Sequence, residues 1–154
     1  MTRFVLRTDG GARGNPGPAG AAFVLTSPEG DLIARSGRYL GETTNNVAEY
    51  EALLWGLRTA VERQATPLTV LSDSELMVRQ LNGLYRVKNA GLKPLHEQAS
   101  RLLARLGDVR VEHVRRAANT EADALANEAM DARGDVGDTT SAANADFGQG
   151  TLFR

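Results

Sequence analysis

The sequence FVLRTDGGARGNPGPAGAAFVLT, residues 4–26, decides the first part of the fold. Its apolar start predicts a strand that stops at Asp9, followed by a glycine- and proline-rich loop over residues 10–18. A second strand is predicted over residues 21–26 and a third over residues 32–40, because the residues between them favour a tight turn. The first part of the chain is therefore expected to form three antiparallel strands.

Helices and strands alternate after these three strands. Apolar residues repeat at helical spacing after Asn45, which we expect to cap a helix, and Asn119 is expected to cap the last helix. Between them the pattern predicts strands at 68–71 and 109–114 and helices at 72–84 and 95–106. This order indicates an α/β fold with a five-stranded mixed sheet, three antiparallel strands and then two parallel ones, flanked by helices.

The bulk composition is typical of one compact domain. The chain has 154 residues and a net charge of −1, which gives no overall sign of a nucleic-acid partner. Because no segment approaches the roughly 20 apolar residues of a membrane span and no signal peptide is evident, we expect a cytoplasmic protein. Helical spacing is lost from residue 134, so a domain at 1–133 is predicted to carry a disordered tail at 134–154.

Four acidic residues fall at the ends or starts of predicted elements: Asp9, Glu49, Asp73 and Asp123. The chain has no cysteine and only two histidines, so any catalytic metal must be bound by carboxylates. Phosphodiester hydrolysis needs an activated water, charge relief on the phosphate and a stabilised leaving oxygen, which two Mg²⁺ ions about 4 Å apart can supply. Each acid taken alone is also compatible with a surface charge or a helix-start residue.

The context of these acids resembles the type 1 ribonuclease H family over residues 3–130. Four motifs carry the resemblance: TDGGARGNPGP at 8–18, TNNVAEYEA at 44–52, SDS at 72–74 and NTEADALA at 119–126. The resemblance implies a ribonuclease H-like fold and an endoribonuclease that hydrolyses the RNA strand of RNA·DNA hybrids. It also implies that Asp9, Glu49, Asp73 and Asp123 hold two Mg²⁺ ions, for which Mn²⁺ can substitute, with Asp9 as the bridging ligand.

The glycine-rich segment also has to be compared with nucleotide-binding loops. It lacks both the Gly-Lys-Ser/Thr ending of a Walker loop and the Gly-x-Gly-x-x-Gly fingerprint of dinucleotide sites. We expect Gly10 and Gly11 to let the backbone approach a nucleic-acid minor groove, where 2′-hydroxyls mark the RNA strand. Asn15 and Asn46 resemble family positions that contact the hybrid, and each is also compatible with a turn or helix-start role.

The remaining predicted substrate-binding residues are Ser74, Glu75, Arg115 and Arg116. Glu75 stands where many relatives have glutamine, which weakens the expected contact to the RNA strand. Residues 115–118 are a short connection where many relatives carry a longer loop with a histidine, and His113 lies within a predicted strand. Arg115 or Arg116 either replaces that histidine electrostatically or is plain surface.

The lysine-rich protrusion of some relatives is missing from residues 85–95. Lower and more salt-sensitive substrate affinity is therefore expected. Arg79, Arg86, Lys88 and Lys93 lie close together in the sequence and suit local phosphate contacts.

Two other functions fit the same fold. One is a catalytically inactive module that binds hybrid or duplex, against which the complete set of four acids argues. The other is an integrase-like nuclease, which normally brings DNA-binding domains that 154 residues cannot contain.

The C-terminal QGTLF at 149–153 resembles the short peptide by which bacterial replication and repair proteins dock on the sliding clamp. Leu152 and Phe153 would enter an apolar pocket and Gln149 would bond at its rim. The alternative is that these apolar residues fold back on the domain or have no role. The protein itself is expected to be a monomer.

Overall fold

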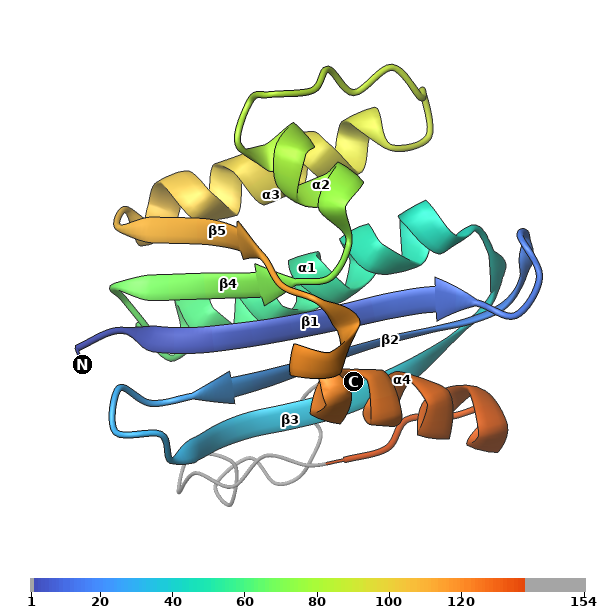
Figure 1. The fold of residues 1–154 in the computed structure, drawn as a ribbon, viewed down its shortest axis with the longest axis horizontal. Helices are drawn as coiled ribbons and strands as arrows, with labels where there is room; N and C mark the ends of the chain where they lie inside the picture. Colours follow the sequence, from blue (N-terminus) through green and yellow to red (C-terminus); the bar gives the residue numbers. More distant parts are fainter. Residues whose placement is uncertain (1, 138–154) are drawn as a thin grey trace.

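A computed structural model describes residues 2–137 as a twisted five-stranded sheet with helices on both faces (Figure 1). The strand order across the sheet is β3-β2-β1-β4-β5. The strands are β1 (Phe4–Ala12), β2 (Gly17–Thr26), β3 (Leu32–Thr43), β4 (Leu68–Ser72) and β5 (Val109–His113). The helices are α1 (Asn45–Glu62), α2 (Glu75–Leu81), α3 (Lys93–Leu106), the 3₁₀ turn η1 (Arg116–Ala118) and α4 (Thr120–Ala132).

The sheet has the mixed topology predicted from the sequence. β1 pairs antiparallel with β2, and β2 pairs antiparallel with β3. β1 and β4 run parallel, as do β4 and β5. The expected fold class is therefore confirmed.

The predicted loop at residues 10–18 begins too early. Gly10, Gly11 and Ala12 continue β1 and pair with residues 19–21 of β2. The glycine at position 10 is required by packing and not by a turn, because a Cβ there would lie 2.3 Å from the main-chain oxygen of Ala48 in α1. A β1 residue with a side chain at this point would push the helix away from the sheet.

Two predicted helix starts are also wrong. α1 is capped by Thr44, whose hydroxyl accepts a hydrogen bond from the main-chain nitrogen of Val47, while Asn45 is already the first helical residue. The helix predicted at 72–84 is shorter, because Ser72 completes β4 and Ser74 caps α2. Hydroxyl groups that accept from the first turn fix both boundaries.

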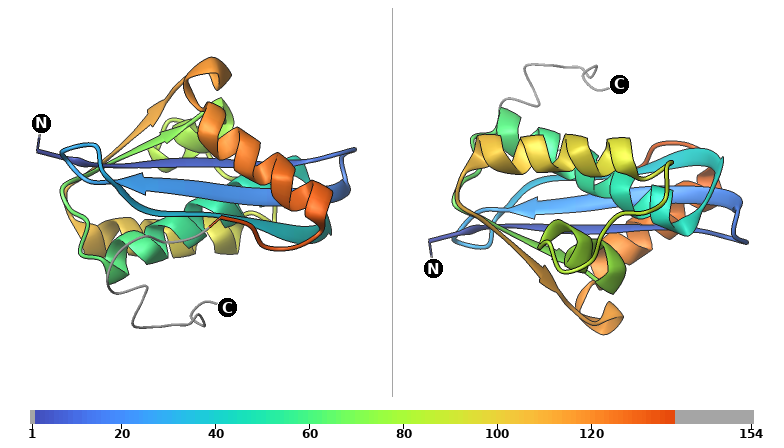
Figure 2. Two further views of the ribbon diagram at one scale, coloured as in Figure 1. Left: turned by 90° about the horizontal axis from the view of Figure 1, so that it is seen from below. Right: turned by 90° about the horizontal axis from the view of Figure 1, so that it is seen from above.

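α1 and α3 lie on one face of the sheet and α4 lies on the other (Figure 2). The larger core forms under α1 and α3, around the fully buried Leu6, Leu53 and Leu57. A smaller apolar cluster joins Leu125 of α4 to β2. None of the helices within residues 2–137 combines the length and apolar character that crossing a membrane requires.

The chain after α4 returns to the outer edge of the sheet. Val136 forms an isolated antiparallel bridge with Gly37 of β3, with two main-chain hydrogen bonds of 2.8 Å. Residues 134–137 were part of the tail predicted to be disordered. Residues 138–154, including the predicted clamp-binding residues Gln149, Leu152 and Phe153, lie outside the described part of the chain.

Candidate active site

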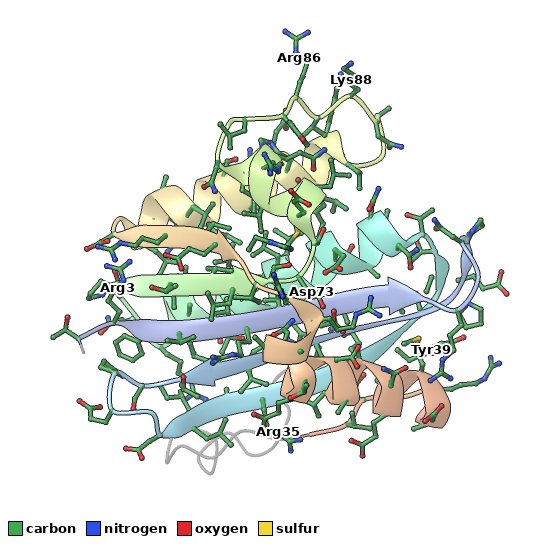
Figure 3. The ribbon with its side chains drawn as sticks, viewed as in Figure 1. Arg3, Arg35, Tyr39, Asp73, Arg86 and Lys88 are labelled. Atoms are coloured by element: carbon green, nitrogen blue, oxygen red, sulfur yellow. The ribbon has the colours of Figure 1, made fainter. Side chains whose placement is uncertain are left out.

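Three carboxylates meet where β1 and β4 run side by side. Thr8 of β1 pairs with Ser72 of β4, so Asp9, which follows Thr8, and Asp73, which follows the end of β4, come side by side. Figure 3 labels Asp73 at this end of β4. Glu49 reaches this place from the first turns of α1. One carboxylate oxygen from each of Asp9, Glu49 and Asp73 lies within 4.8 Å of the other two. The structure therefore brings together three of the four acids predicted as metal ligands.

Asp123, the fourth predicted acid, lies in the first turn of α4 beside Asp9. Burial, together with the negative charges of Asp73 and Asp123, raises the pKa of Asp9 to about 8. Burial and the charges of Asp9 and Asp73 likewise hold the pKa of Glu49 well above its ordinary value. Without a cation, Asp9 and Glu49 therefore resist ionisation.

The donor atoms of this cluster fit a hard divalent cation. Glu49 Oε1 and Asp73 Oδ2 are buried without a hydrogen-bond donor among the described residues. The side chain of Arg116 is 82% exposed, and its Nε lies 3.8 Å from Asp73 Oδ2. Because an unpaired buried carboxylate oxygen is costly, and because Mg²⁺ prefers oxygen ligands, these residues are suited to hold such an ion.

The predicted asparagines lie at the start of α1. Asn15 Oδ1 accepts a hydrogen bond from the main-chain nitrogen of Asn45 over 3.1 Å, and Asn45 Oδ1 accepts one from Ala12 over 2.7 Å. These bonds tie the β1–β2 turn to the helix that carries Glu49. Asn46 is exposed in the first turn of the same helix. The turn and the helix start therefore form one polar surface beside the carboxylates.

The other predicted contact residues are distributed around Asp73. Ser74 caps α2, and Glu75 Oε2 accepts two hydrogen bonds from Arg79, one from Nε over 2.9 Å and one from Nη2 over 2.6 Å. Arg79 lowers the pKa of Glu75, so this exposed side chain remains a carboxylate engaged with its neighbour. Arg115 and Arg116 are both exposed after β5, and Arg116 faces Asp73.

An apolar surface on α2 and the loop after it was not predicted from the sequence. The exposed large apolar residues of the described chain are Leu76, Leu84 and Tyr85, at 39%, 66% and 48% exposure. With Arg86 and Lys88 they line a groove of about 530 Å³, which we call the α2 patch. Arg86 and Lys88 project from this end of the molecule (Figure 3). The sequence feature that could have indicated this surface is the pair Leu84 and Tyr85, which lies beside the basic residues Arg86 and Lys88.

A buried polar network lies beneath the α2 patch. The Tyr50 hydroxyl of α1 donates a hydrogen bond to Gln80 Oε1 of α2 over 2.6 Å, and both side chains are buried. His96 Nε2 of α3 lies 3.3 Å from the main-chain oxygen of Gln80. Gln80 thus joins three helices, and its partner Tyr50 is the residue after Glu49 in α1.

Comparisons with known proteins agree with this arrangement. A family model described as reverse transcriptase-like matches residues 7–129. A ribonuclease H of Roseobacter denitrificans is 30% identical over 122 residues, which are 73% of this chain and 79% of the relative. The chain belongs to the ribonuclease H family. The ribonuclease HI of Halobacterium salinarum is 42% identical over 123 residues, or 80% of this chain and 62% of the relative.

Solved structures of this ribonuclease H family superpose on most of the chain. RNase H1 from Halobacterium salinarum is 40% identical and covers 84% of this chain and 98% of its own, with a TM-score of 0.81. LC11-RNase H1, solved in complex with an RNA/DNA hybrid, is 41% identical and covers 85% of this chain and 99% of its own, also with a TM-score of 0.81.

Some relatives are much longer than the matched ribonuclease H region. The bifunctional protein Rv2228c of Mycobacterium tuberculosis is 47% identical over 131 residues, 84% of this chain but 36% of the relative. The chain therefore spans about a third of the length of its mycobacterial relatives and less than two thirds of the halobacterial one.

Proposed function

We propose that this chain is a metal-dependent endoribonuclease that hydrolyses the RNA strand of RNA·DNA hybrids. The observation that carries the proposal is the convergence of Asp9, Glu49 and Asp73 within 4.8 Å, with Asp123 beside Asp9. The likeness to LC11-RNase H1, a protein solved with such a hybrid, supports the choice of substrate. We also propose that the present chain acts in the cytoplasm as a monomer.

The four acids are proposed to hold two Mg²⁺ ions, with Asp9 as the shared ligand and with Mn²⁺ able to substitute. When bound, such ions activate water, relieve phosphate charge and stabilise the leaving oxygen. Asp9 is buried, and Glu49 Oε1 is a buried oxygen without a hydrogen-bond donor among the described residues, so both would offer oxygen ligands to such ions. The exposed Arg116 offers a positive charge at the solvent side of Asp73, where a phosphate would enter.

The two strands of the hybrid are proposed to contact different parts of the surface. The polar surface formed by Asn15, Asn46 and the backbone of Gly10 and Gly11 lies beside the carboxylates and suits the 2′-hydroxyls of the RNA strand. The α2 patch suits the other strand, because an exposed tyrosine can stack on a base or sugar and its basic residues can bind phosphates.

The test is cleavage of end-labelled RNA·DNA, RNA·RNA and DNA·DNA duplexes, with and without Mg²⁺. We expect Mg²⁺-dependent cuts in the RNA strand of the hybrid alone, and their loss in Asp73→Asn, since an amide cannot neutralise a hard cation. Binding of hybrid without cleavage by the wild-type protein would indicate the inactive module. Cleavage of DNA·DNA would indicate an integrase-like nuclease.

The residues Gln149, Leu152 and Phe153 are proposed to dock on a bacterial sliding clamp. This part of the proposal rests on the sequence pattern. Its test is binding of the peptide 146–154 to a purified clamp, against a peptide with Leu152→Ala and Phe153→Ala. Equal and negligible binding by both peptides would remove the clamp proposal and leave the nuclease proposal intact.

A further inference from the structure

A second groove lies between α1 and α3, the two helices on the opposite face of the sheet from α4 (Figure 2). Its volume is about 260 Å³. Its lining residues are Arg58 from α1 and Gln98, Arg101, Leu102 and Arg105 from α3. None of them belongs to the carboxylate cluster or to the α2 patch.

Among the described residues, the three arginines of this groove have no acidic partner within 4.0 Å. Within residues 2–137, ion pairs of 4.0 Å or less join other arginines to acids, in Arg3–Asp108, Arg13–Asp131, Arg35–Glu121, Arg79–Glu75 and Arg116–Asp73. Arg101 and Arg105 are also four residues apart on one helix, a spacing at which like charges repel. The groove therefore gathers three guanidinium groups that no acidic side chain within residues 2–137 approaches to 4.0 Å.

The groove has guanidinium groups from both of its helices, Arg58 from α1 and Arg101 and Arg105 from α3. Arg58 Nη2 donates a hydrogen bond to Gln98 Oε1 over 3.0 Å, which holds the guanidinium across the groove from α1 to α3. The half-buried Leu102 gives the long arginine side chains an apolar surface to lie on. Guanidinium groups present paired N–H donors that match phosphate oxygens in geometry and charge.

We propose that this groove is a phosphate-binding site, separate from the carboxylate cluster. Its ligand is either the backbone of a nucleic acid or the phosphate chain of a free nucleotide, because both present the same oxygens. Three guanidinium groups carry more positive charge than one carboxylate side chain can neutralise, and a doubly charged phosphate or a run of phosphates supplies more of the opposite charge. The inference goes beyond hybrid cleavage and does not depend on it.

Pyrophosphate is the probe that tests the site. It is titrated into ¹⁵N-labelled protein in metal-free buffer of low ionic strength while the backbone amide signals are followed. We expect saturable shifts at residue 58 and at residues 98–105, and at least a tenfold loss of affinity in Arg101→Gln/Arg105→Gln. The control variant Arg110→Gln/Arg133→Gln removes the same charge outside the groove and is expected to retain wild-type affinity.

Three results would overturn the proposed site. They are the absence of saturable amide shifts with pyrophosphate, shifts confined to residues outside the groove, and equal pyrophosphate affinity in the groove variant and the control. Tighter binding of a polyglutamate peptide than of pyrophosphate would also overturn it, because the groove would then be a peptide-binding surface. ATP and a twelve-nucleotide single-stranded DNA distinguish a free nucleotide from a nucleic-acid backbone as the ligand. The groove variant should lose more affinity for whichever of the two is the true ligand. Cleavage of a short hybrid by the groove variant reports separately on the proposed function.

Discussion

Asn119 donates a hydrogen bond from its side-chain Nδ2 to the main-chain oxygen of Thr8, over 2.9 Å. Asn119 is fully buried, and Thr8 belongs to the last register pair of β1 and β4. The main-chain nitrogen of Asp123 in turn donates to the main-chain oxygen of Asn119 over 3.1 Å. One side chain therefore links the strand that carries Asp9 to the helix turn that carries Asp123.

The first prediction concerns this link. Asn119→Ala should lower the free energy of unfolding by about 2 kcal/mol, because a buried carbonyl loses its donor and a small cavity forms. Because the relative position of Asp9 and Asp123 is no longer fixed, Mg²⁺ should also bind several-fold more weakly. Urea unfolding and calorimetric titration with Mg²⁺ measure the two effects.

Asn127→Ala is the matched control for that prediction. Asn127 lies on the same helix, and its Nδ2 donates to the main-chain oxygen of Asp123, but its side chain is only partly buried. A small change in stability and unchanged Mg²⁺ affinity are expected. If Asn119→Ala matched this control in both measurements, the link would have no positioning role.

Asn119 also shows where prediction from sequence ends. An asparagine before a helix is read locally as a cap, but the structure shows no capping hydrogen bond from its side chain. Its partner, Thr8, is 111 residues away, and no local pattern identifies such a contact. The same limit explains Gly10, whose glycine signalled a turn although the reason for it is the backbone of α1.

The positions of the acids were predictable for the opposite reason. Asp9 and Asp73 each follow an apolar strand segment, and neighbouring parallel strands place such residues side by side. Glu49 and Asp123 required the family resemblance, because an acid in the first turns of a helix is ordinarily a surface residue. Tyr50 and Gln80 were hidden because each fits the apolar or polar pattern of its own helix.

The second prediction concerns pH and the metal-free protein. The pKa of Asp9 rises from an unfolded value near 3.8 to about 8 in the folded protein, so the folded state binds more protons across that window. The free energy of unfolding should therefore fall as pH rises from 5 to 8, by about 3.5 kcal/mol. Urea unfolding in EDTA at unit steps of pH measures the slope.

Asp9→Asn should make that slope shallower and stabilise the metal-free protein at pH 8. Asp31→Asn, at an exposed turn, should leave the slope unchanged. In the wild-type protein, excess Mg²⁺ should reduce the fall of the free energy of unfolding with pH, since a bound cation favours the ionised carboxylates. An identical pH slope in wild type and Asp9→Asn would show that Asp9 ionises normally in the folded protein.

The third prediction concerns Tyr50 and Gln80. Tyr50→Phe leaves Gln80 Oε1 buried without its donor, so unfolding should become about 2 kcal/mol easier. The double variant Tyr50→Phe/Gln80→Met should recover most of this loss, because neither side chain then needs a polar partner. Unfolding of all four proteins in a double-mutant cycle measures the coupling, and a coupling near zero would contradict it.

The fourth prediction tests the α2 patch as the site of the second strand. Arg86→Ala/Lys88→Ala should reduce the slope of log affinity against log salt by about 2, because about two phosphate contacts are lost. Tyr85→Ala should weaken hybrid binding by roughly 1–3 kcal/mol while leaving that slope unchanged, because stacking is not a charge contact. Fluorescence anisotropy with labelled hybrid at several salt concentrations measures both quantities.

In cleavage assays the same α2 patch variants should raise KM more than they lower kcat, because the altered residues are proposed to contact the substrate away from the carboxylates. Arg133→Ala serves as the control, since Arg133 lies after α4 and contacts Tyr39. An unchanged salt slope in Arg86→Ala/Lys88→Ala would place the second strand elsewhere. A collapse of kcat at saturating hybrid would instead mean that α2 orders Asp73, which lies two residues before its start.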